Sequence, residues 1–227
     1  MPLVQEQFFD IGANLTHESF TKDLDSVITE ASKLGVKRLS VTGSSVKDSL
    51  EAFEITQRYP KTCISTAGIH PHNAKEYSTA AFSEIKDLLK NDLVKSIGET
   101  GLDFNRNFSS AEDQQKSFEA HLELSIELNK PLLLHERDAH EKFVEITSLY
   151  LKDLPKSVVH CFTGTEEALK KYLDMGFYIG ITGWLCDERR GKHLEELISQ
   201  IPLEKLMIET DAPYFCLLYT SPSPRDA

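Results

Sequence analysis

Carboxylate and imidazole side chains recur in this sequence at the ends of short apolar runs. They are Asp10, His70, His72, Glu99, Asp103, His135, His160 and Asp211, with Asn14 four residues after the first. None is a cysteine, and such nitrogen and oxygen donors suit Mg²⁺, Mn²⁺ or Zn²⁺ in an open hydrolytic site. A bound divalent ion lowers the pKa of its water, so that hydroxide is available near neutral pH. Two ions about 4 Å apart can hold a phosphate together with the attacking and leaving oxygens. The residue types therefore indicate metal-dependent hydrolysis.

The apolar runs in front of these side chains alternate with longer amphipathic stretches, which predicts right-handed βαβ units and a parallel sheet. The predicted strands are Phe8–Ile11, Arg38–Thr42, Cys63–Gly68, Val94–Gly98, Pro131–Leu134, Ser157–His160, Phe177–Thr182 and Lys205–Glu209. Eight such strands favour an α/β fold of the closed (β/α)8 type. No glycine-rich phosphate fingerprint opens the first helix, so a Rossmann-type sheet is disfavoured.

Between the strands, apolar residues recur at helical spacing. One stripe extends over residues 20–34, and Gly35 follows where a helix would end. Another lies within 168–173, where Thr165 is expected to cap the N-terminus and Gly176 to stop the helix. We expect these stripes to face the core rather than a ligand.

The placement of the polar residues follows from this fold. In a barrel of parallel strands the active site forms at the C-terminal face, where the strands end. The carboxylate and imidazole residues named above close or follow six different predicted strands at that face. One such residue would more often be a packed or solvated side chain, but the same placement on six strands indicates a functional site.

The composition indicates which binding partners and which cellular location are expected. The chain has 25 Lys and Arg against 36 Asp and Glu, which gives a net charge of −11. Sequence-independent electrostatic binding to the phosphates of duplex DNA is therefore not expected. It shows no signal peptide and no apolar stretch near the roughly 20 residues that span a bilayer. Four widely spaced cysteines predict reduced thiols. We expect a soluble, cytoplasmic monomer with no membrane partner.

We expect one domain over residues 1–215. After Tyr214 the chain reads FCLLYTSPSPRDA, without a helical stripe, so residues 216–227 are predicted to be disordered or foreign to the domain. A closed barrel needs a helix after its eighth strand. The barrel is therefore expected to lack its final helix and to expose apolar surface on strands one and eight.

Seven segments resemble the TatD family of nucleases. They are FDIGANLT, STAGIHPH, IGETGLDFNRNFS, HERDAH, VVHCFTGT, YIGITGWLCDERRG and LMIETDAPY, spread over about residues 8 to 215. The resemblance implies a (β/α)8 barrel of the amidohydrolase-like superfamily of metal-dependent hydrolases. It also implies a metal-dependent deoxyribonuclease. Among the ions that the residue types suit, we expect Mg²⁺, with Mn²⁺ or Zn²⁺ as alternatives. The DIGxN form of the first segment points to the branch of 3′→5′ exonucleases that act on ends of single-stranded DNA and RNA.

The same resemblance assigns roles to individual residues. It implies that Glu99 of IGETGLD bridges the metal ions, and that His135 of HERDAH and His160 of VVHCF bind one of them. Asp211 of IETDAPY is implied to bind a metal and to orient or deprotonate the attacking water. His70 of GIHPH is implied to be a catalytic or phosphate-contacting residue.

The chain departs from many relatives in its first motif. Those relatives carry Asp-x-His-x-His, whose histidines hold a metal, whereas Gly12 and Asn14 stand at these positions here. One metal subsite should therefore be weaker, held by Asp10, Glu99 and Asp211 together with water. Asn14 can still offer an oxygen.

Substrate contacts are expected from His72, Phe104, Arg106 and Arg137, since an aromatic ring can stack on an unpaired base and an arginine can hold a phosphate. A loop aromatic that only packs on the rim is an equal alternative for Phe104. The loop 184–190 either lines a substrate groove or is solvated. Four more histidines are expected at the surface: His17, His121, His140 and His193.

Two other functions remain open. A small-molecule amidohydrolase or phosphoesterase would use the same ligands, since a metal-activated water attacks carbon and phosphorus alike, although that chemistry usually keeps the paired histidines. A non-catalytic binding scaffold is disfavoured by the intact Glu99, His135, His160 and Asp211.

Overall fold

The predicted strands form one parallel sheet in the computed structural model, which describes residues 7–187 and 191–214. Within these residues each strand pairs with the next along the chain, from the first to the eighth. The strands are β1 (Phe8–Ala13), β2 (Val36–Val41), β3 (Cys63–Ala67), β4 (Val94–Asp103), β5 (Leu132–Arg137), β6 (Val158–Val159), β7 (Tyr178–Ile181) and β8 (Leu206–Ile208). The (β/α)8 topology predicted from the sequence is confirmed.

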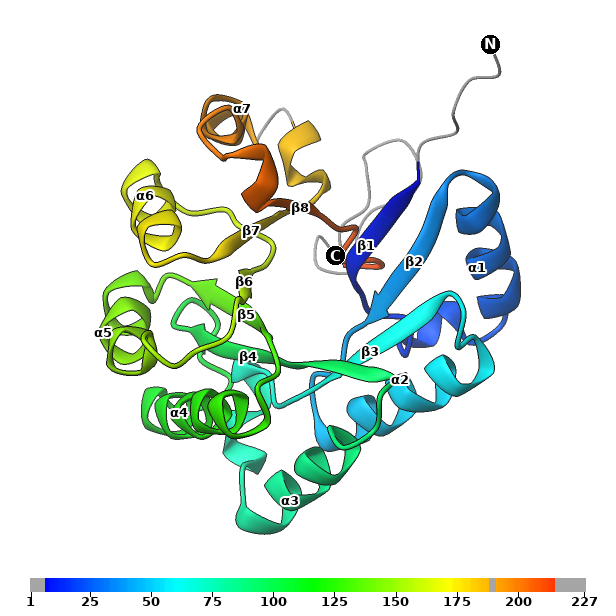
Figure 1. Ribbon diagram of the computed structural model, residues 1–227, viewed down its shortest axis with the longest axis horizontal. Helices are drawn as coiled ribbons and strands as arrows, with labels where there is room; N and C mark the ends of the chain where they lie inside the picture. The colour runs from blue at the N-terminus through cyan, green and yellow to red at the C-terminus, as the bar shows by residue number, and fades with distance from the viewer. Residues whose placement is uncertain (1–6, 188–190, 215–227) are drawn as a thin grey trace.

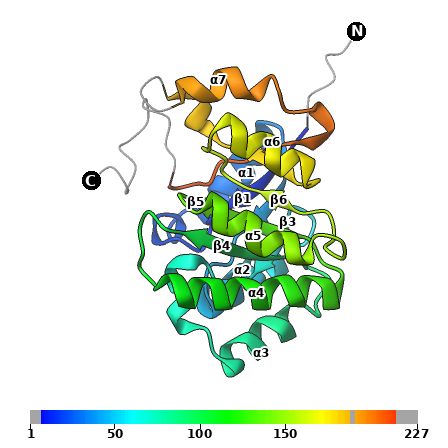
Figure 2. The same cartoon turned by 90° about the vertical axis from the view of Figure 1, so that its left-hand side faces the viewer.

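Helices surround the strands in chain order (Figure 1). They are α1 (Leu24–Lys33), α2 (Val46–Arg58), α3 (Thr79–Leu88), α4 (Ala111–Leu128), α5 (His140–Tyr150), α6 (Glu166–Asp174) and α7 (Lys192–Ile198). Short 3₁₀ turns are η1 (Glu18–Phe20), η2 (Pro71–Glu76), η3 (Gly183–Cys186) and η4 (Leu203–Lys205). Figure 2 shows α3 and α7 at opposite ends of the molecule.

Helix ends follow the capping chemistry of the sequence. The Thr165 side chain accepts a hydrogen bond from the N–H of Ala168 and caps α6, as predicted. Gly176 and Gly35 lie just past α6 and α1 with φ of 87° and 104°, a region that favours glycine. These signals place the ends of α1 and α6 correctly.

The main core lies between the strands and the helices, and it contains a histidine that the sequence did not lead us to expect there. The prediction that His121 lies at the surface is wrong, because its side chain on α4 is fully buried. Its Nδ1 donates to the Ser117 carbonyl at 2.6 Å, and its Nε2 accepts from the N–H of Ile69 at 3.1 Å. Both ring nitrogens are thus satisfied in the core. His193 is exposed, as predicted, and His17 and His140 are half-buried.

The barrel closes where β1 meets the chain after β8. The Asp211 N–H donates to the Gly12 carbonyl at 2.8 Å, and the Asn14 N–H donates to the Ala212 carbonyl at 2.7 Å. A parallel bridge pairs Ala13 with Ala212. This seam therefore fixes two of the predicted site residues, Asn14 and Asp211, beside each other.

Apolar side chains are exposed on the two strands at the seam. Phe8 and Phe9 on β1 and Ile208 on β8 are 39%, 40% and 45% exposed. The expectation that strands one and eight show apolar surface is confirmed for these residues. Residues 216–227 lie outside the described residues, so the predictions about the tail and the final helix stay predictions.

Two further features concern the described residues as a group. Cys63, Cys161 and Cys186 form no disulfide with one another. The helices in this part of the chain include none that is long and apolar enough to cross a membrane.

Candidate metal centre

Strand β4 carries two of the predicted site residues inside the strand rather than after it. Glu99 and Asp103 both fall within Val94–Asp103. One extra residue of β4 is inserted opposite β5 between Ile97 and Thr100. A bulge of this kind changes the direction in which the following side chains point. The sequence does not show the bulge, and the predicted end of the strand at Gly98 was therefore too early.

Two glycines allow β4 to run close against β5. Gly98 and Gly101 have φ of 128° and 144°, where a side chain would be strained. A Cβ at Gly101 would also collide with the carbonyl oxygen of His135. The GETG segment therefore requires glycine on both sides of Glu99, and it brings this carboxylate next to β5.

Three imidazoles converge on one oxygen of Glu99. Its Oε1 lies 3.1 Å from His70 Nε2, 2.9 Å from His135 Nδ1 and 2.7 Å from His160 Nε2. The rings come from the end of β3, from β5 and from the end of β6, and Glu99 is only 6% exposed. Four of the predicted site residues are thus brought together at the C-terminal face of the barrel.

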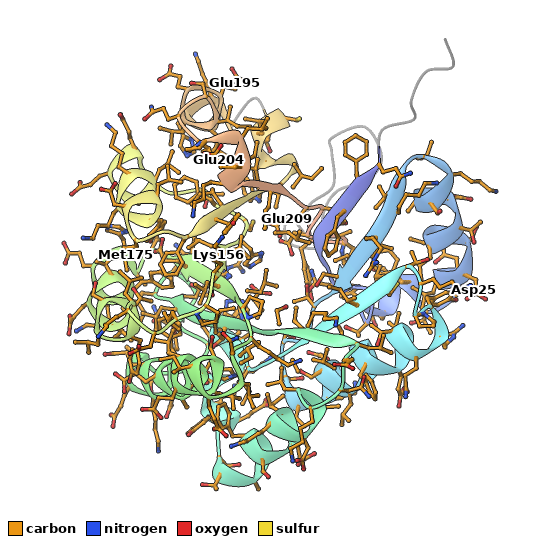
Figure 3. The ribbon with its side chains drawn as sticks, in the orientation of Figure 1. Asp25, Lys156, Met175, Glu195, Glu204 and Glu209 are labelled. Carbon is orange, nitrogen blue, oxygen red and sulfur yellow. The ribbon has the colours of Figure 1, made fainter. Side chains whose placement is uncertain are left out.

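His160 is oriented by a carboxylate that the sequence analysis did not single out. Glu209, directly after β8 and at the junction with β1 (Figure 3), places Oε2 3.3 Å from His160 Nδ1. Its Oε1 accepts the N–H of Cys161. In the neutral ring, an Nδ1–H that donates to Glu209 leaves the lone pair of Nε2 directed toward Glu99. Histidines that bind metals are commonly held in this way.

Glycines on the neighbouring strands make room for Glu209. A Cβ at Gly12 would lie 2.5 Å from Glu209 Oε2, and one at Gly180 would lie 2.7 Å from Oε1. Gly12, which the sequence analysis treated as a missing metal ligand, therefore accommodates the carboxylate that holds His160. The position of Glu209 two residues before Asp211 in IETD was the available signal for it.

His70 can act either as a metal ligand or as a hydrogen-bond donor, and the tautomer of its ring decides which. Its Nδ1 accepts the N–H of His72 at 3.1 Å, so the neutral ring carries its proton on Nε2 and donates toward Glu99. Burial lowers the pKa of His70 to about 4, although the charge of Glu99 opposes the shift. One nitrogen each of His70 and His135 and a Glu99 oxygen lie within 4.8 Å of one another, close enough to share an ion. The protonated Nε2 makes His70 a hydrogen-bond donor rather than a ligand.

His135 faces a second carboxylate. Its Nε2 is 3.5 Å from Asp103 Oδ2, which also lies 2.6 Å from His72 Nε2. Asp103 Oδ1 accepts the N–H groups of Asn105 and Arg106, as expected of an Asp that opens a loop. His135 Nε2 is buried and has no hydrogen-bond partner among the described residues. An imidazole whose Nδ1 contacts Glu99 and whose buried Nε2 faces Asp103 without a hydrogen bond fits a site for a divalent cation.

The charges of the cluster support this interpretation. Burial would raise the pKa of Glu99, but His160 and His70 hold it well below its ordinary value. Burial would lower the pKa of His160, but the charges of Glu99 and Glu209 raise it well above. The pKa of His135 is also raised, because Asp103 and Glu99 outweigh the effect of burial. The cluster therefore stabilises positive charge at its centre.

The seam contributes Asp211 and Asn14 to the same pocket, which has a volume of about 640 Å³ and also contains the four converging residues. Asp211 Oδ1 accepts a hydrogen bond from Asn14 Nδ2 at 2.9 Å. Asp10 does not line this pocket, and its carboxylate accepts hydrogen bonds from Thr210 and Gly12. Its predicted part in a weaker metal subsite stays a prediction.

The predicted substrate contacts divide between two pockets. His72, Arg106 and Arg137 line the pocket of the metal centre, and Phe104 lines an adjoining one. Sequence reasoning missed Phe108, which is 56% exposed and meets the His72 ring edge-on at 4.8 Å between centroids.

Comparison with known proteins agrees with this geometry. The sequence profile of the family described as TatD related DNase matches residues 9–222. The protein named 3′-5′ ssDNA/RNA exonuclease TatD from Escherichia fergusonii is 48% identical over 216 residues, which cover 95% of this chain and 83% of that protein. The protein of the same name from Escherichia coli K12 is 47% identical, with the same coverage.

The structural comparison points the same way. The structure of a hydrolase TatD family protein from Entamoeba histolytica superposes with a TM-score of 0.84 at 32% identity, covering 92% of this chain and 75% of that one.

Proposed function

The chain belongs to the TatD related DNase family, and from this premise we propose that it is a metal-dependent 3′→5′ exonuclease acting on single-stranded DNA or RNA. The observation that carries the proposal is the convergence of His70, His135 and His160 on one oxygen of Glu99 in a pocket at the barrel mouth. The names of the relatives supply the substrate class and the direction of degradation.

Glu99, His135, His160 and Asp211 would hold the cation. All four line one pocket, and Glu209 fixes the ring of His160. Mg²⁺ is the ion that we propose, with Mn²⁺ and Zn²⁺ as alternatives. A bound divalent ion polarises the scissile phosphate and lowers the pKa of the attacking water.

The protein's own groups orient the substrate and move its protons. His70 donates from Nε2, and this donor is suited to a non-bridging oxygen of the phosphate. Asp211, whose Oδ1 accepts a hydrogen bond from Asn14, would accept the proton of the attacking water. His72, Arg106 and Arg137 lie around the same pocket, where they would contact the strand. A single domain over residues 1–215, a monomeric state and a cytoplasmic location belong to the same proposal.

The test compares three substrate classes with Mg²⁺ or with EDTA: a 5′-labelled single-stranded oligonucleotide, a dinucleotide and a panel of amides. We expect stepwise shortening of the oligonucleotide from its 3′ end in Mg²⁺ alone. Turnover of amides beside an intact oligonucleotide would instead identify a small-molecule amidohydrolase. Inertness toward every substrate would identify a binding scaffold. The Glu99→Gln protein, purified in parallel, controls for contaminating nucleases.

A further inference from the structure

A second pocket lies beside the metal centre, and we call it the outer pocket. Its volume is about 850 Å³, within the usual range for a site that binds one small ligand. Four residues line both pockets: Glu136, Arg137, Thr163 and Trp184. The outer pocket is therefore continuous with the site where hydrolysis is proposed to occur.

Two aromatic rings stand in the walls of the outer pocket. Phe104 directly follows β4, and Trp184 lies in η3 after β7. Both rings are half-buried and pack against the main hydrophobic core. Each ring is thus fixed by the core while part of it stays accessible, an arrangement suited to stacking on a base.

The carboxylates of the outer pocket are largely engaged by neighbouring groups. Glu136 accepts the Tyr172 hydroxyl at 2.8 Å and the Ala139 N–H at 2.8 Å. Asp138 accepts from Asn105 Nδ2 at 2.6 Å. The described lining also includes Glu141 and Glu145, so its four carboxylates outnumber Arg137 and Lys142 and do not favour a polyanionic ligand.

The cation at the shared wall is Arg137. Its Nη1 donates to the Thr163 hydroxyl at 3.3 Å, which directs the guanidinium along the boundary between the two pockets. Lys142, the other strong cation among the described residues that line the outer pocket, is paired with Glu145 at 2.5 Å. One arginine beside two rings matches a single phosphate beside a base better than a polyanionic ligand.

We propose that the outer pocket binds the third nucleotide from the 3′ end of a single strand, an inference that rests on the proposed exonuclease function. The base stacks against Phe104 and Trp184. Arg137 contacts the phosphate that joins the second and third nucleotides. The metal centre then holds the last two nucleotides and the bond to be cleaved.

The proposed subsite predicts how kcat/KM should depend on the number of nucleotides in the substrate. Stacking on an aromatic side chain changes affinity by roughly 5- to 150-fold per base. A trinucleotide should exceed a dinucleotide in kcat/KM by a factor in this range, and longer strands should add little. One extra phosphate contact should also steepen the dependence of log(kcat/KM) on log[salt] by about 0.7.

The kinetic test compares a dinucleotide, a trinucleotide and a trinucleotide that lacks the base of its third nucleotide from the 3′ end. We expect the abasic trinucleotide to lose the part of the advantage that stacking supplies and to keep only the smaller gain from the phosphate contact with Arg137. Phe104→Ala and Trp184→Ala should remove most of the trinucleotide advantage. Phe8→Ala, which removes an exposed ring at the start of β1, serves as the matched control and should retain it.

Trp184 is the only tryptophan in the sequence, so its fluorescence reports binding without turnover. A phosphorothioate trinucleotide that resists cleavage should quench the emission, whereas the dinucleotide and the abasic trinucleotide should not. Equal quenching by all three, or none with the trinucleotide, would overturn the proposal.

The outcomes separate this inference from the function on which it rests. Cleavage of the dinucleotide without a trinucleotide advantage refutes only the outer subsite. Absence of cleavage on every nucleotide substrate refutes the exonuclease, while the fluorescence titration still tests the stacking. An equal loss on both substrates in Phe104→Ala would mean that this ring has a structural role only, and would count against the proposal.

Discussion

Asp10 on β1 is joined to Thr210, just past β8, by two hydrogen bonds across the closure of the barrel. The Thr210 hydroxyl donates to Oδ2 at 2.6 Å, and the Thr210 N–H donates to Oδ1 at 3.0 Å. The Gly12 N–H donates to the same carboxylate at 3.2 Å, and Asp10 is buried. One carboxylate thus ties the first strand to the last, beside Asp211 of the candidate site.

We expect Asp10→Ala to lower the free energy of unfolding by about 3 kcal/mol, because two N–H groups lose their acceptor and each buried unsatisfied donor costs about 1–3 kcal/mol. Asp10→Asn keeps an acceptor oxygen and should lose less than about 1 kcal/mol. Urea unfolding measures both changes. An alanine variant that unfolds at the wild-type midpoint would show that the seam does not depend on Asp10.

Glu99→Gln is expected to reduce hydrolysis at least about 1,000-fold, since a ligand that binds and polarises the cation supplies several kcal/mol of transition-state stabilisation. Glutamine has nearly the same volume and keeps an oxygen for the surrounding rings, so the fold should persist. Circular dichroism and thermal unfolding provide the control. Activity within tenfold of wild type would remove Glu99 from the mechanism.

His135→Ala and His160→Ala should each weaken metal binding, and the double variant should be little worse than either single one. Both rings contact the same Glu99 oxygen, and ligands of one ion act as a unit, so their effects do not add. The measurement is a double-mutant cycle on kcat/KM. Clean additivity of the logarithms would mean that the two histidines do not share an ion.

Glu209→Gln should weaken affinity for Mn²⁺ by about 10- to 100-fold, the usual effect of losing a carboxylate that orients a metal-binding histidine. Isothermal titration calorimetry reads this directly. Glu204→Gln, at an exposed glutamate of η4, is the matched control and should leave the affinity unchanged. If both variants bind Mn²⁺ equally well, Glu209 does not act through His160.

Much of the fold could be predicted because strand and helix periodicities are local properties of the sequence. The alternation placed all eight strands, and the capping signals at Thr165 and Gly176 held. The end of β4 could not be placed, since its bulge depends on the register with β5 rather than on nearby residues. Glu99 and Asp103 were therefore predicted to follow a strand that contains them.

The site was predicted in part for the same reason. Placing polar residues at strand ends was enough to gather Glu99, His135 and His160, because all parallel strands end at one face. Glu209 was missed, because its role depends on the space above Gly12 and Gly180, which are distant in sequence. His121 was misplaced because its partner, the N–H of Ile69, lies 52 residues away.

The burial of His121 predicts a pH dependence of stability. Burial lowers its pKa to about 4, below the ordinary 6.5, although the bond to the Ser117 carbonyl opposes the shift. The unfolded chain therefore takes up the proton first as the pH falls. The contribution is fully present above pH 6.5 and is lost toward pH 4, by about 3 kcal/mol in total.

His121→Gln should flatten this part of the stability profile, because glutamine keeps an acceptor for Ile69 and does not titrate. Urea unfolding at several pH values between 4 and 7.5 compares the two proteins. The difference between them isolates His121 from other groups that titrate in the range. Parallel profiles would show that the buried imidazole is not the source of the acid sensitivity.

The last prediction concerns strand preference. With a net charge of −11, the chain has little general attraction for duplex DNA, and the rings that line the two pockets require unpaired bases. The metal centre lies among loops at the barrel mouth, which admits a flexible single strand more readily than a wide duplex. We therefore expect degradation of single-stranded ends and scarcely any attack on blunt duplex.

The decisive comparison uses one 5′-labelled strand in Mg²⁺, either free or annealed to its complement. The free strand should shorten one nucleotide at a time from its 3′ end, and a single-stranded 3′ overhang should be trimmed until it meets the duplex. A closed single-stranded circle offers no end and should survive. Equal degradation of the blunt duplex, or internal cuts in the circle, would contradict the proposed exonuclease function. The proposal of a metal-dependent hydrolase would stand, because the cluster around Glu99 does not itself require a strand end.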